Sequence, residues 1–244
     1  MRIGIIGAMD VELATVISCL TNQSSKVYSP EYVGKVEFRR FEYRDLDVVL
    51  CASGCGKVNA ALATSILISK FKCTDIINVG ICGTLSKHLK PGDLVIPDLA
   101  MQYDCDTTEL GETRYMIQGT SGITKYSISK KLRDCLAVAA NICGRDTYMS
   151  DCLAASGDTF IGSKKQIKYY GLNKLKPAVV DMESGAIAHT CWILGAEFAA
   201  IKEVTDDCSS DDYESNKHTA SSKLSSVILV FLSKLSETKV TNNE

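Results

Sequence analysis

The chain alternates between short apolar runs and longer segments whose apolar positions recur with the period of a helix. Runs rich in β-branched residues are typical of strands buried on both faces. We expect such strands at Arg2–Ile6, Asp47–Ala52, Thr74–Val79, Asp93–Ile96, Tyr148–Ala155, Val179–Asp181 and Phe198–Val204, and a half-buried strand at Val33–Tyr43. Helical patterns begin at Asp10 and cover Val58–Phe71, Ser127–Ala140, Lys164–Tyr170, Ser184–Leu194 and Lys217–Leu235.

Strands that alternate with helical crossovers predict an α/β fold, a three-layer α/β/α sandwich around a central mixed, mostly parallel sheet. No Pro-rich or Gly/Ser-rich linker divides the 244 residues, which favours a single domain over residues 1–236 with a polar tail at 237–244. Residues from about Gln102 to Thr124 lack periodicity. A loop this long in a compact domain usually serves function or an interface.

The composition indicates which kinds of partner and which cell compartment to expect. A hydrophobic content of 45% can form a substantial core, and a net charge of -2 gives no case for a nucleic-acid or anionic-membrane partner. No apolar stretch approaches the roughly 20 residues that span a bilayer, and acids closely follow the short apolar run at the start, unlike a signal peptide. The eleven cysteines contain no C-x-x-C pair. Scattered cysteines of this kind usually fill apolar positions in the core and remain reduced. We therefore expect a cytoplasmic protein.

Three carboxylates lie at or just after the ends of two predicted buried strands in the C-terminal half of the chain. Asp181 and Glu183 follow the strand that begins at Val179, and Asp206 follows the next strand. Ligands of open α/β sheets bind at the carboxyl ends of strands, and burial of Asp206 there would raise its pKa and suit it to act as a general acid. Asp is also a common cap and turn residue, so position alone leaves both interpretations open.

Other candidate features are weaker. Glu12 lies one turn into the first helix, and its position alone favours the role of an acid that interacts with the helix dipole over a role in a site. Glycine turns are expected at Ser53–Lys57 and Gly80–Gly83, where backbone N–H groups could meet a ligand or glycine could allow close packing. Neither matches a P-loop or a dinucleotide-binding motif. The three histidines lack metal-ligand spacing, and no nucleophile signature occurs, which leaves carboxylate chemistry.

Six segments taken together resemble the family of 5′-methylthioadenosine/S-adenosylhomocysteine nucleosidases, within the purine nucleoside phosphorylase-like superfamily. They occur in the family's order over nearly the full length. The segments are GIIGAMDVE at Gly4–Glu12, SGCGKVNAA at Ser53–Ala61, INVGICG at Ile77–Gly83, SGDTFI at Ser156–Ile161, VVDMESGAIAH at Val179–His189 and KEVTD at Lys202–Asp206.

The resemblance implies hydrolysis of the N-glycosidic bond of 5′-substituted adenosines, without a cofactor. Asp206 would protonate adenine N7, and Glu12 would be the general base for the attacking water. Glu183 would hold the ribose hydroxyls, with Met182 lining the ribose. These roles follow the logic of inverting glycoside hydrolysis, with an acid at the leaving group and a base at water on the opposite face.

The resemblance also implies the remaining substrate contacts. Phe160 would stack on adenine, and backbone groups of Phe160 and Ile161 would bind its edge, while Asp181 and Thr205 would support the site. Ile81 stands where many bacterial members carry Ser, and Lys202 where many carry Arg, a change that alters bidentate hydrogen bonding. Leu110 is expected to touch the 5′ substituent. The loop Asp104–Thr108 resembles a family segment that reaches into the neighbouring subunit's site. The longer loop at Met101–Ile117 has no obvious core to cover within one subunit, which predicts a homodimer.

Two alternatives remain at this stage. A purine nucleoside phosphorylase would use phosphate in place of water, and a phosphate dianion needs neutralising Arg side chains. The related hexameric phosphorylases carry such an Arg where Asn78 stands, and their GDPxR segment is replaced here by GAMDVE, whose Glu12 would repel phosphate. A non-catalytic nucleoside-binding protein on the same fold is the second alternative, because fold alone does not imply activity.

Overall fold

The computed structural model describes residues 1–117, 119–120, 122–145, 152–208, 213, 216 and 221–241. Its strands are β1 Arg2–Gly7, β2 Lys26–Val27, β3 Glu31–Val33, β4 Val36–Tyr43, β5 Leu46–Ala52, β6 Asp75–Thr84, β7 Leu94–Val95, β8 Leu99–Gln102, β9 Tyr126–Ser127, β10 Leu153–Ser156, β11 Val179–Asp181 and β12 Glu197–Asp206. Its helices are α1 Asp10–Gln23, α2 Lys57–Ser69, η1 Thr108–Leu110, α3 Lys130–Ile142, α4 Lys164–Tyr169, α5 Leu172–Leu175, α6 Ser184–Leu194 and α8 Ser221–Thr241.

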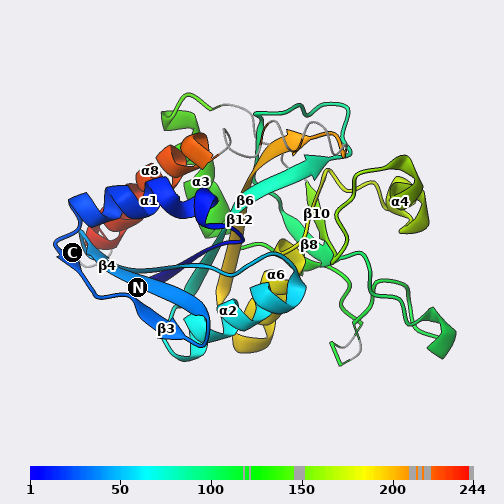
Figure 1. Cartoon of the computed structure of the whole chain (residues 1–244), viewed down its shortest axis with the longest axis horizontal. Coiled ribbons are helices and arrows are strands. Elements are labelled where there is room, and N and C mark those ends of the chain that lie inside the picture. Colours follow the sequence, from blue (N-terminus) through cyan, green and yellow to red (C-terminus); the bar gives the residue numbers. More distant parts are fainter. Residues whose placement is uncertain are drawn as a thin grey trace.

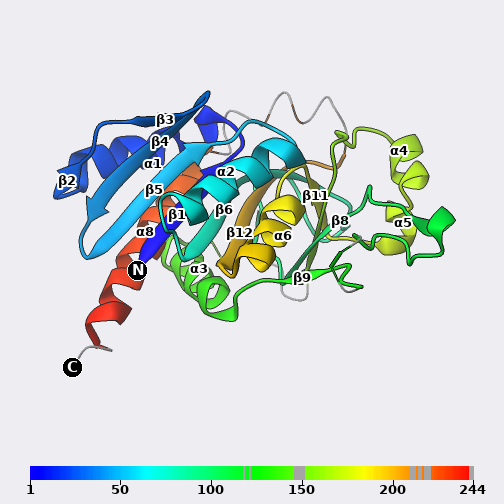
Figure 2. The same cartoon turned by 90° about the horizontal axis from the view of Figure 1, so that it is seen from below.

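The strands form one mixed sheet, in agreement with the predicted fold class. Strands β5, β1, β6 and β12 run parallel at its centre, whereas β2, β3, β4, β7 and β9 add antiparallel pairs. Helices α1, α3 and α8 cover one face, and α2 and α6 cover the other (Figures 1 and 2). These are the three layers expected from strands that alternate with helical crossovers.

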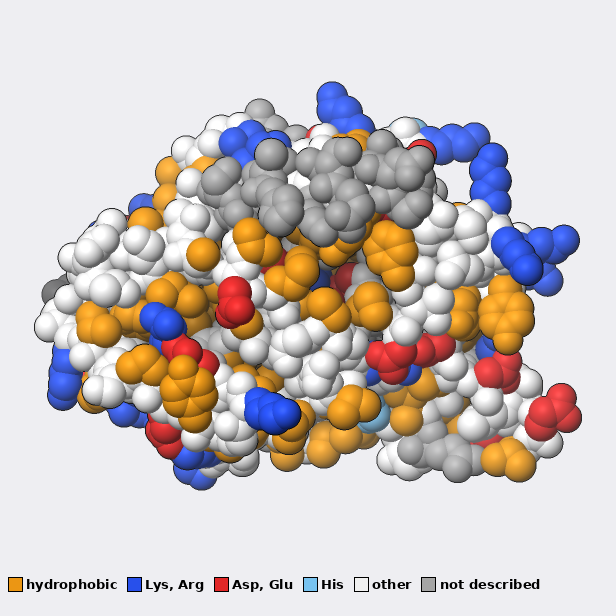
Figure 3. Space-filling model, viewed as in Figure 1, with side chains coloured by type: hydrophobic (Ala, Val, Ile, Leu, Met, Phe, Trp, Pro, Cys, Tyr) orange, Lys and Arg blue, Asp and Glu red, His pale blue; other side chains and the backbone are white. Residues whose placement is uncertain are grey.

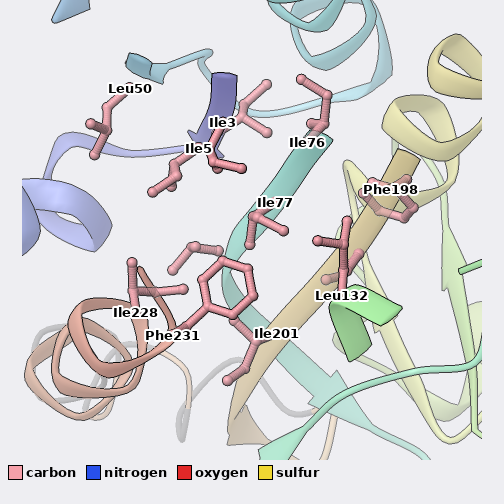
Figure 4. Packing of buried hydrophobic residues seen from close by; sticks show 14 of the residues in the cluster. Ile3, Ile5, Leu50, Ile76, Ile77, Leu132, Phe198, Ile201, Ile228 and Phe231 are labelled. Atoms are coloured by element: carbon pink, nitrogen blue, oxygen red, sulfur yellow. The ribbon is translucent and has the colours of Figure 1, made fainter. Parts of the chain in front are cut away.

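The core extends over both faces of the sheet, and on one face the sheet packs against α8. Ile228 and Phe231 of α8 point toward Ile77 and Ile201 of the central strands, and all four side chains are fully buried (Figure 4). The β-branched residues that signalled strands thus form one wall of a continuous apolar cluster. Among the described residues, no helix has the length and apolar content to cross a bilayer. All eleven cysteines are free thiols, and only Cys55 is exposed.

One edge of strand β6 is unpaired over a short interval, where a ligand can approach the sheet. Along one edge it pairs with β12 over almost its whole length. Along the other edge it pairs with β1 as far as Asn78 and then, from Gly83, with β11 in the antiparallel direction. Between these two positions neither strand pairs with that edge of β6. The open interval lies at the carboxyl end of β1, where ligands of such sheets bind.

Several predicted boundaries were wrong. Gly80–Gly83 is not a turn, because β6 continues through it to Thr84 and pairs there with β11 and β12. The predicted strand Val33–Tyr43 is a hairpin of β3 and β4 around Gly34, whose φ is +61°. Helix α8 continues to Thr241, beyond the predicted Leu235, and includes part of the expected polar tail. Helix α6 is less amphipathic than expected, since Ser184–Ala188 are buried without interruption.

Two predicted elements extend outside the described residues. The strand predicted from Tyr148 is β10, described from Leu153, and the part at 148–151 lies outside the described range. Likewise, residues 217–220 of the helix predicted from Lys217 are not described. The loop predicted at Gln102–Thr124 contains only the short helix η1 between β8 and β9, among the residues that are described there.

Candidate active site

A cavity of about 560 Å³, counted with its open mouth, lies over the unpaired interval of β6. Figure 3 shows hydrophobic side chains gathered around a hollow near the middle of this face. The lining residues come from segments distant in sequence: Ala8, Met9, Glu12, Cys55, Ile81, Cys82, Gly83, Thr159, Phe160, Ile161, Val180, Asp181, Met182, Glu183, Thr205, Asp206 and Tyr213.

Asp206 lies at one end of the cavity, at the carboxyl end of β12, and is 2% exposed. The backbone N–H of Cys208 donates to its Oδ1 at 2.8 Å, and the hydroxyl of Thr205 donates to its Oδ2 at 2.8 Å. A shift of register between Val204 and Asp206 separates this residue from the regular pairing with β6. Such an irregularity re-aims a side chain, and here the two donors fix the orientation of the carboxyl group.

Glycines at two positions of β6 leave room for the carboxylates. A Cβ on Gly83 would lie 2.8 Å from Oδ1 of Asp206, and a Cβ on Gly80 would lie 2.8 Å from Oε1 of Glu12. Three residues of extended strand span about 10 Å. The two carboxyl groups therefore lie directly against β6 at positions that are three residues apart.

Gly83→Ala is expected to lower kcat/KM for the reaction carried out in this cavity by about 10²-fold, because the added methyl group forces Asp206 away from its present position. Steady-state kinetics would measure the loss. Thermal unfolding supplies the control, since a fold that is intact apart from the displaced carboxyl group should keep most of its Tm. A variant with wild-type kcat/KM would show that the position of Asp206 is not critical.

Glu12 lies at the other end of the cavity and combines the two roles that the sequence left open. Its Oε2 accepts hydrogen bonds from the backbone N–H groups of Ala8 and Met9, at 2.7 and 2.9 Å, and so caps the first turn of α1. Its Oε1 accepts from the backbone N–H of Ile81, at 3.2 Å, on the unpaired edge of β6. Burial raises the pKa of Glu12 despite Lys202 and these donors, which makes it a stronger base than an exposed carboxylate.

Asp181 and Lys202 form a buried ion pair beneath the cavity. Lys202 Nζ lies 2.8 Å from Asp181 Oδ2, and each side chain is at most 2% exposed. Asp181 also accepts hydrogen bonds from the hydroxyls of Ser156 and Ser184 and from the Ser184 N–H. Burial opposes ionisation of Asp181, but Lys202 and these donors outweigh it and lower its pKa.

Lys202 is also a shared counterion for the cavity. Burial opposes its charge, but Asp181, Glu183 and Glu12 outweigh burial and raise its pKa. A Cβ on Gly80 would lie 3.3 Å from Lys202 Nζ, on the side where Glu12 approaches the same glycine. One cation therefore serves three carboxylates. Removing it would leave them buried without compensation, a costly arrangement.

Glu183 is held from the opposite side of the cavity. The backbone N–H of Gly56, in the turn before α2, donates to its Oε1 at 2.9 Å. Gly56 has φ +95°, a conformation that favours glycine. Burial, with the nearby charges of Asp181 and Glu12, raises the pKa of Glu183 to about 7, although Lys202 and Gly56 act in the other direction.

The pH dependence follows from this arrangement. If ionised Glu183 holds the substrate, kcat/KM should rise about tenfold per pH unit as the pH increases toward pH 7, because protonation below the raised pKa removes the charge. Ionisation of Glu12, whose pKa is also raised, acts in the same direction. A profile of kcat/KM from pH 5 to 9 measures this limb. A flat profile over that range would contradict an ionised carboxylate in this role.

Aromatic residues line the mouth of the cavity. Phe160 is 40% exposed and contacts the ring of Tyr213 edge to face, with centroids 5.0 Å apart. Its backbone carbonyl accepts a hydrogen bond from Gln166 Nε2 at 3.1 Å. Ile161 is buried beside it. An exposed aromatic ring above a polar floor suits stacking on a planar base.

Most of the residues singled out from sequence meet in this cavity. Glu12, Ile81, Phe160, Ile161, Asp181, Met182, Glu183, Thr205 and Asp206 line it, and Lys202 lies beneath it. Leu110 does not line it. This residue is 70% exposed on η1. Sequence reasoning missed Ala8, Met9, Cys55, Cys82, Gly83, Thr159, Val180 and Tyr213 as lining residues, although Cys55 and Gly83 lie in segments noted for their glycines.

Among the described residues, no histidine lines the cavity. His189 lies on α6, stacks on Tyr126 with centroids 5.1 Å apart, and is within hydrogen-bond distance of Gln102 Nε2 at 3.3 Å. Across the part of the chain that the structure describes, no three His, Cys, Asp or Glu side chains are grouped to hold a metal ion. The ionised groups that the structure describes at the cavity are carboxylates and Lys202, and thiols and hydroxyls of Cys55, Cys82, Thr205 and Tyr213 also line it.

Comparison with known proteins agrees with this fold. The family model described as the phosphorylase superfamily matches residues 2–233. The 5′-methylthioadenosine/S-adenosylhomocysteine nucleosidase of Buchnera aphidicola is 32% identical over 241 residues, covering 96% of this chain and 99% of that one. A protein of the same name from Staphylococcus aureus is 36% identical over 209 residues, covering 84% and 86%.

A solved structure agrees as well. The nucleosidase of the same name from Neisseria meningitidis, in complex with methylthio-immucillin-A, has a TM-score of 0.85 and 27% identity and covers 95% of this chain and 98% of that one. The cavity and sheet therefore define a protein of the phosphorylase superfamily. Within it, the chain belongs to the family of 5′-methylthioadenosine/S-adenosylhomocysteine nucleosidases.

Proposed function

We propose that this protein hydrolyses the N-glycosidic bond of 5′-substituted adenosines, such as 5′-methylthioadenosine and S-adenosylhomocysteine, and releases adenine and the 5′-substituted ribose. The observation that carries the proposal is the placement of two buried carboxyl groups, Asp206 and Glu12, in the lining of one cavity, where they lie against Gly83 and Gly80 of β6. An acid for the leaving base and a base for water, both facing the same cavity, are the pair of groups that inverting hydrolysis requires.

Asp206 acts as the general acid in this proposal. Protonation of adenine N7 turns the base into a neutral leaving group, so the glycosidic bond breaks without expelling an anion. The Cys208 N–H and the Thr205 hydroxyl hold the carboxyl group in one orientation. Phe160 stacks on the base, and backbone groups of Phe160 and Ile161 bind its edge, with Tyr213 beside the aromatic ring.

The ribose and the water occupy the other end of the cavity. Glu183 accepts hydrogen bonds from the ribose hydroxyls with Met182 beside it, while Glu12 takes a proton from the attacking water. The developing oxocarbenium charge is positive, and the surrounding carboxylates stabilise it electrostatically. Ile81 contributes an apolar side chain here, and its N–H orients Glu12. Lys202 and Asp181 support this network from below.

A direct assay follows from the reaction. Purified protein should release adenine from 5′-methylthioadenosine in phosphate-free buffer, monitored by chromatography, and added millimolar phosphate should leave the rate unchanged. Strict dependence on phosphate would indicate phosphorolysis instead. Binding of the nucleoside without any release of adenine would indicate a non-catalytic binding protein. A panel of 5′-substituted adenosines, compared by kcat/KM, would then define the preferred 5′ substituent.

We also propose that the protein is a homodimer. Large apolar side chains are exposed on the loop after β8 and on α2 and α6, among them Leu110 at 70%, Val58 at 77% and Trp192 at 46%. Burying such side chains against a second copy would be favourable, and Leu110 would then contact the 5′ substituent in the partner's cavity. Sedimentation at micromolar concentration should give a dimer. A fully active monomer would contradict this assignment.

The cellular site is part of the same proposal. Eleven free thiols in one chain fit a reducing compartment such as the cytoplasm. Cell fractionation should recover the adenine-releasing activity with cytoplasmic markers.

A further inference from the structure

Three charged residues at the rim of the cavity form a closed set of contacts that the proposed reaction does not use. Lys57 begins α2, Asp104 lies in the loop after β8, and Asp158 lies in the loop after β10. Lys57 Nζ lies 2.6 Å from Asp104 Oδ1, and the Lys57 N–H donates to Asp158 Oδ1 at 2.7 Å. The Asp158 N–H donates to Asp104 Oδ2 at 2.9 Å. We refer to these three residues as the rim clamp.

Each contact joins segments far apart in the chain. The pairs are separated by 47, 101 and 54 residues, so no local structure would bring them together. The side chains of Lys57 and Asp104 are only 17% and 16% exposed. Partial removal from water strengthens the attraction between opposite charges, and this pair is more restrained than one on an open surface.

The rim clamp lies one residue from a contact that the site requires. Gly56, whose N–H donates to Glu183 Oε1 at 2.9 Å, directly precedes Lys57. A Cβ on Gly56 would lie 3.0 Å from Asp158 Oδ1, so the aspartate packs tightly against this turn. On its other side, Asp158 is followed by Thr159, which lines the cavity.

We propose that Lys57, Asp104 and Asp158 are positioning residues, which hold the Gly56 N–H on Glu183 and anchor the loop after β8 to the rim of the cavity. None of the three lines the cavity, and each acts through its neighbours. The inference rests on the proposed function, because it assigns Glu183 to the ribose. The loop that starts at Asp104 is the segment expected to reach the partner subunit, so the clamp also connects that loop to Glu183.

The test uses Lys57→Met and Asp104→Asn in the full-length protein. Each should lower kcat/KM for adenine release from 5′-methylthioadenosine about tenfold, the cost of losing one hydrogen bond to a charged group. The acid limb of the pH profile should move to higher pH, because Glu183 loses the donor that favours its charge. The double variant should lose no more than either single variant, since both remove the same ion pair.

Hydrogen exchange gives a readout that does not depend on activity. The backbone amide of Gly56 should exchange roughly tenfold faster in Lys57→Met, because its hydrogen bond is no longer held in place. Lys70→Met is the matched control. Lys70 follows the other end of α2 and pairs with Glu31 on the surface, so its loss should change neither kinetics nor Gly56 exchange. Lys57→Arg should lose less activity than Lys57→Met, because the arginine can make its own contact with Asp104.

Wild-type kinetics and wild-type Gly56 exchange in Lys57→Met and Asp104→Asn would overturn the inference. Asp104→Asn is nearly isosteric and serves if Lys57→Met does not fold. Failure of the proposed function has a different signature. In that case the wild-type protein would release no adenine. The exchange experiment would still test the rim clamp by itself: faster exchange at Gly56 in the variants would support it, and unchanged exchange would refute it.

Discussion

Asp206→Asn is expected to lower kcat for adenine release by about 10³-fold, which is within the range for removing a general acid. The amide cannot deliver a proton to adenine N7, so the base would have to leave as an anion. The replacement keeps the size of the side chain and its acceptor for the Cys208 N–H or the Thr205 hydroxyl. Nucleoside binding should therefore stay within about tenfold of wild type, as measured by calorimetry.

Asp207→Asn is the matched control for this variant, because Asp207 is adjacent in sequence but exposed. It should retain wild-type kinetics. If Asp206→Asn released adenine at close to the wild-type rate, the proton would have to come from another group, and the assignment of Asp206 would be wrong.

Glu12→Gln is expected to lower kcat by a comparable factor, about 10²- to 10⁴-fold, because the neutral amide cannot take a proton from water. Three backbone N–H groups point at the two carboxylate oxygens of Glu12. The amide NH₂ must face at least one of these donors, so the side chain also loses a hydrogen bond. Single-turnover measurements with saturating 5′-methylthioadenosine would isolate the chemical step.

Asp10→Asn controls for changes at the start of α1, since Asp10 is exposed in the same helical turn. It should leave kcat unchanged. The position of Glu12 makes one further comparison informative. Glu12→Asp keeps the negative charge but shortens the side chain, so the carboxylate moves away from the position of the water. The variant should lose activity mainly for this reason, and its pH profile should keep its acid limb. An active Glu12→Gln variant would remove Glu12 from the mechanism.

The sequence pattern predicted the layers of the fold and the two ends of the site for physical reasons. Buried parallel strands must be apolar, so β1, β5, β11 and β12 were visible as β-branched runs. Asp181 and Asp206, the last residues of β11 and β12, both line the cavity, although β11 runs antiparallel to β6 and β12 runs parallel to it. Glu12 was ambiguous from its sequence position, and the structure shows that it caps α1 while facing the cavity.

The features that sequence did not reveal depend on contacts between distant segments. Gly80–Gly83 has the composition of a turn, yet pairing with β11 and β12 keeps it extended, because tertiary context overrides local preference. Tyr213 has no pattern that marks it as a cavity residue. The contacts of Lys57 with Asp104 and Asp158 join three separate loops, and no spacing in the chain predicts them.

The central claim is that water, activated by Glu12, attacks a nucleoside whose base is protonated by Asp206. The most direct measurement is adenine release from 5′-methylthioadenosine by the wild-type protein in phosphate-free buffer, alongside Asp206→Asn and Glu12→Gln. The account predicts full activity of the wild type without phosphate, unchanged when phosphate is added, and loss of about 10²-fold or more in each variant. Adenine release that requires phosphate, or that survives in either variant, would contradict it.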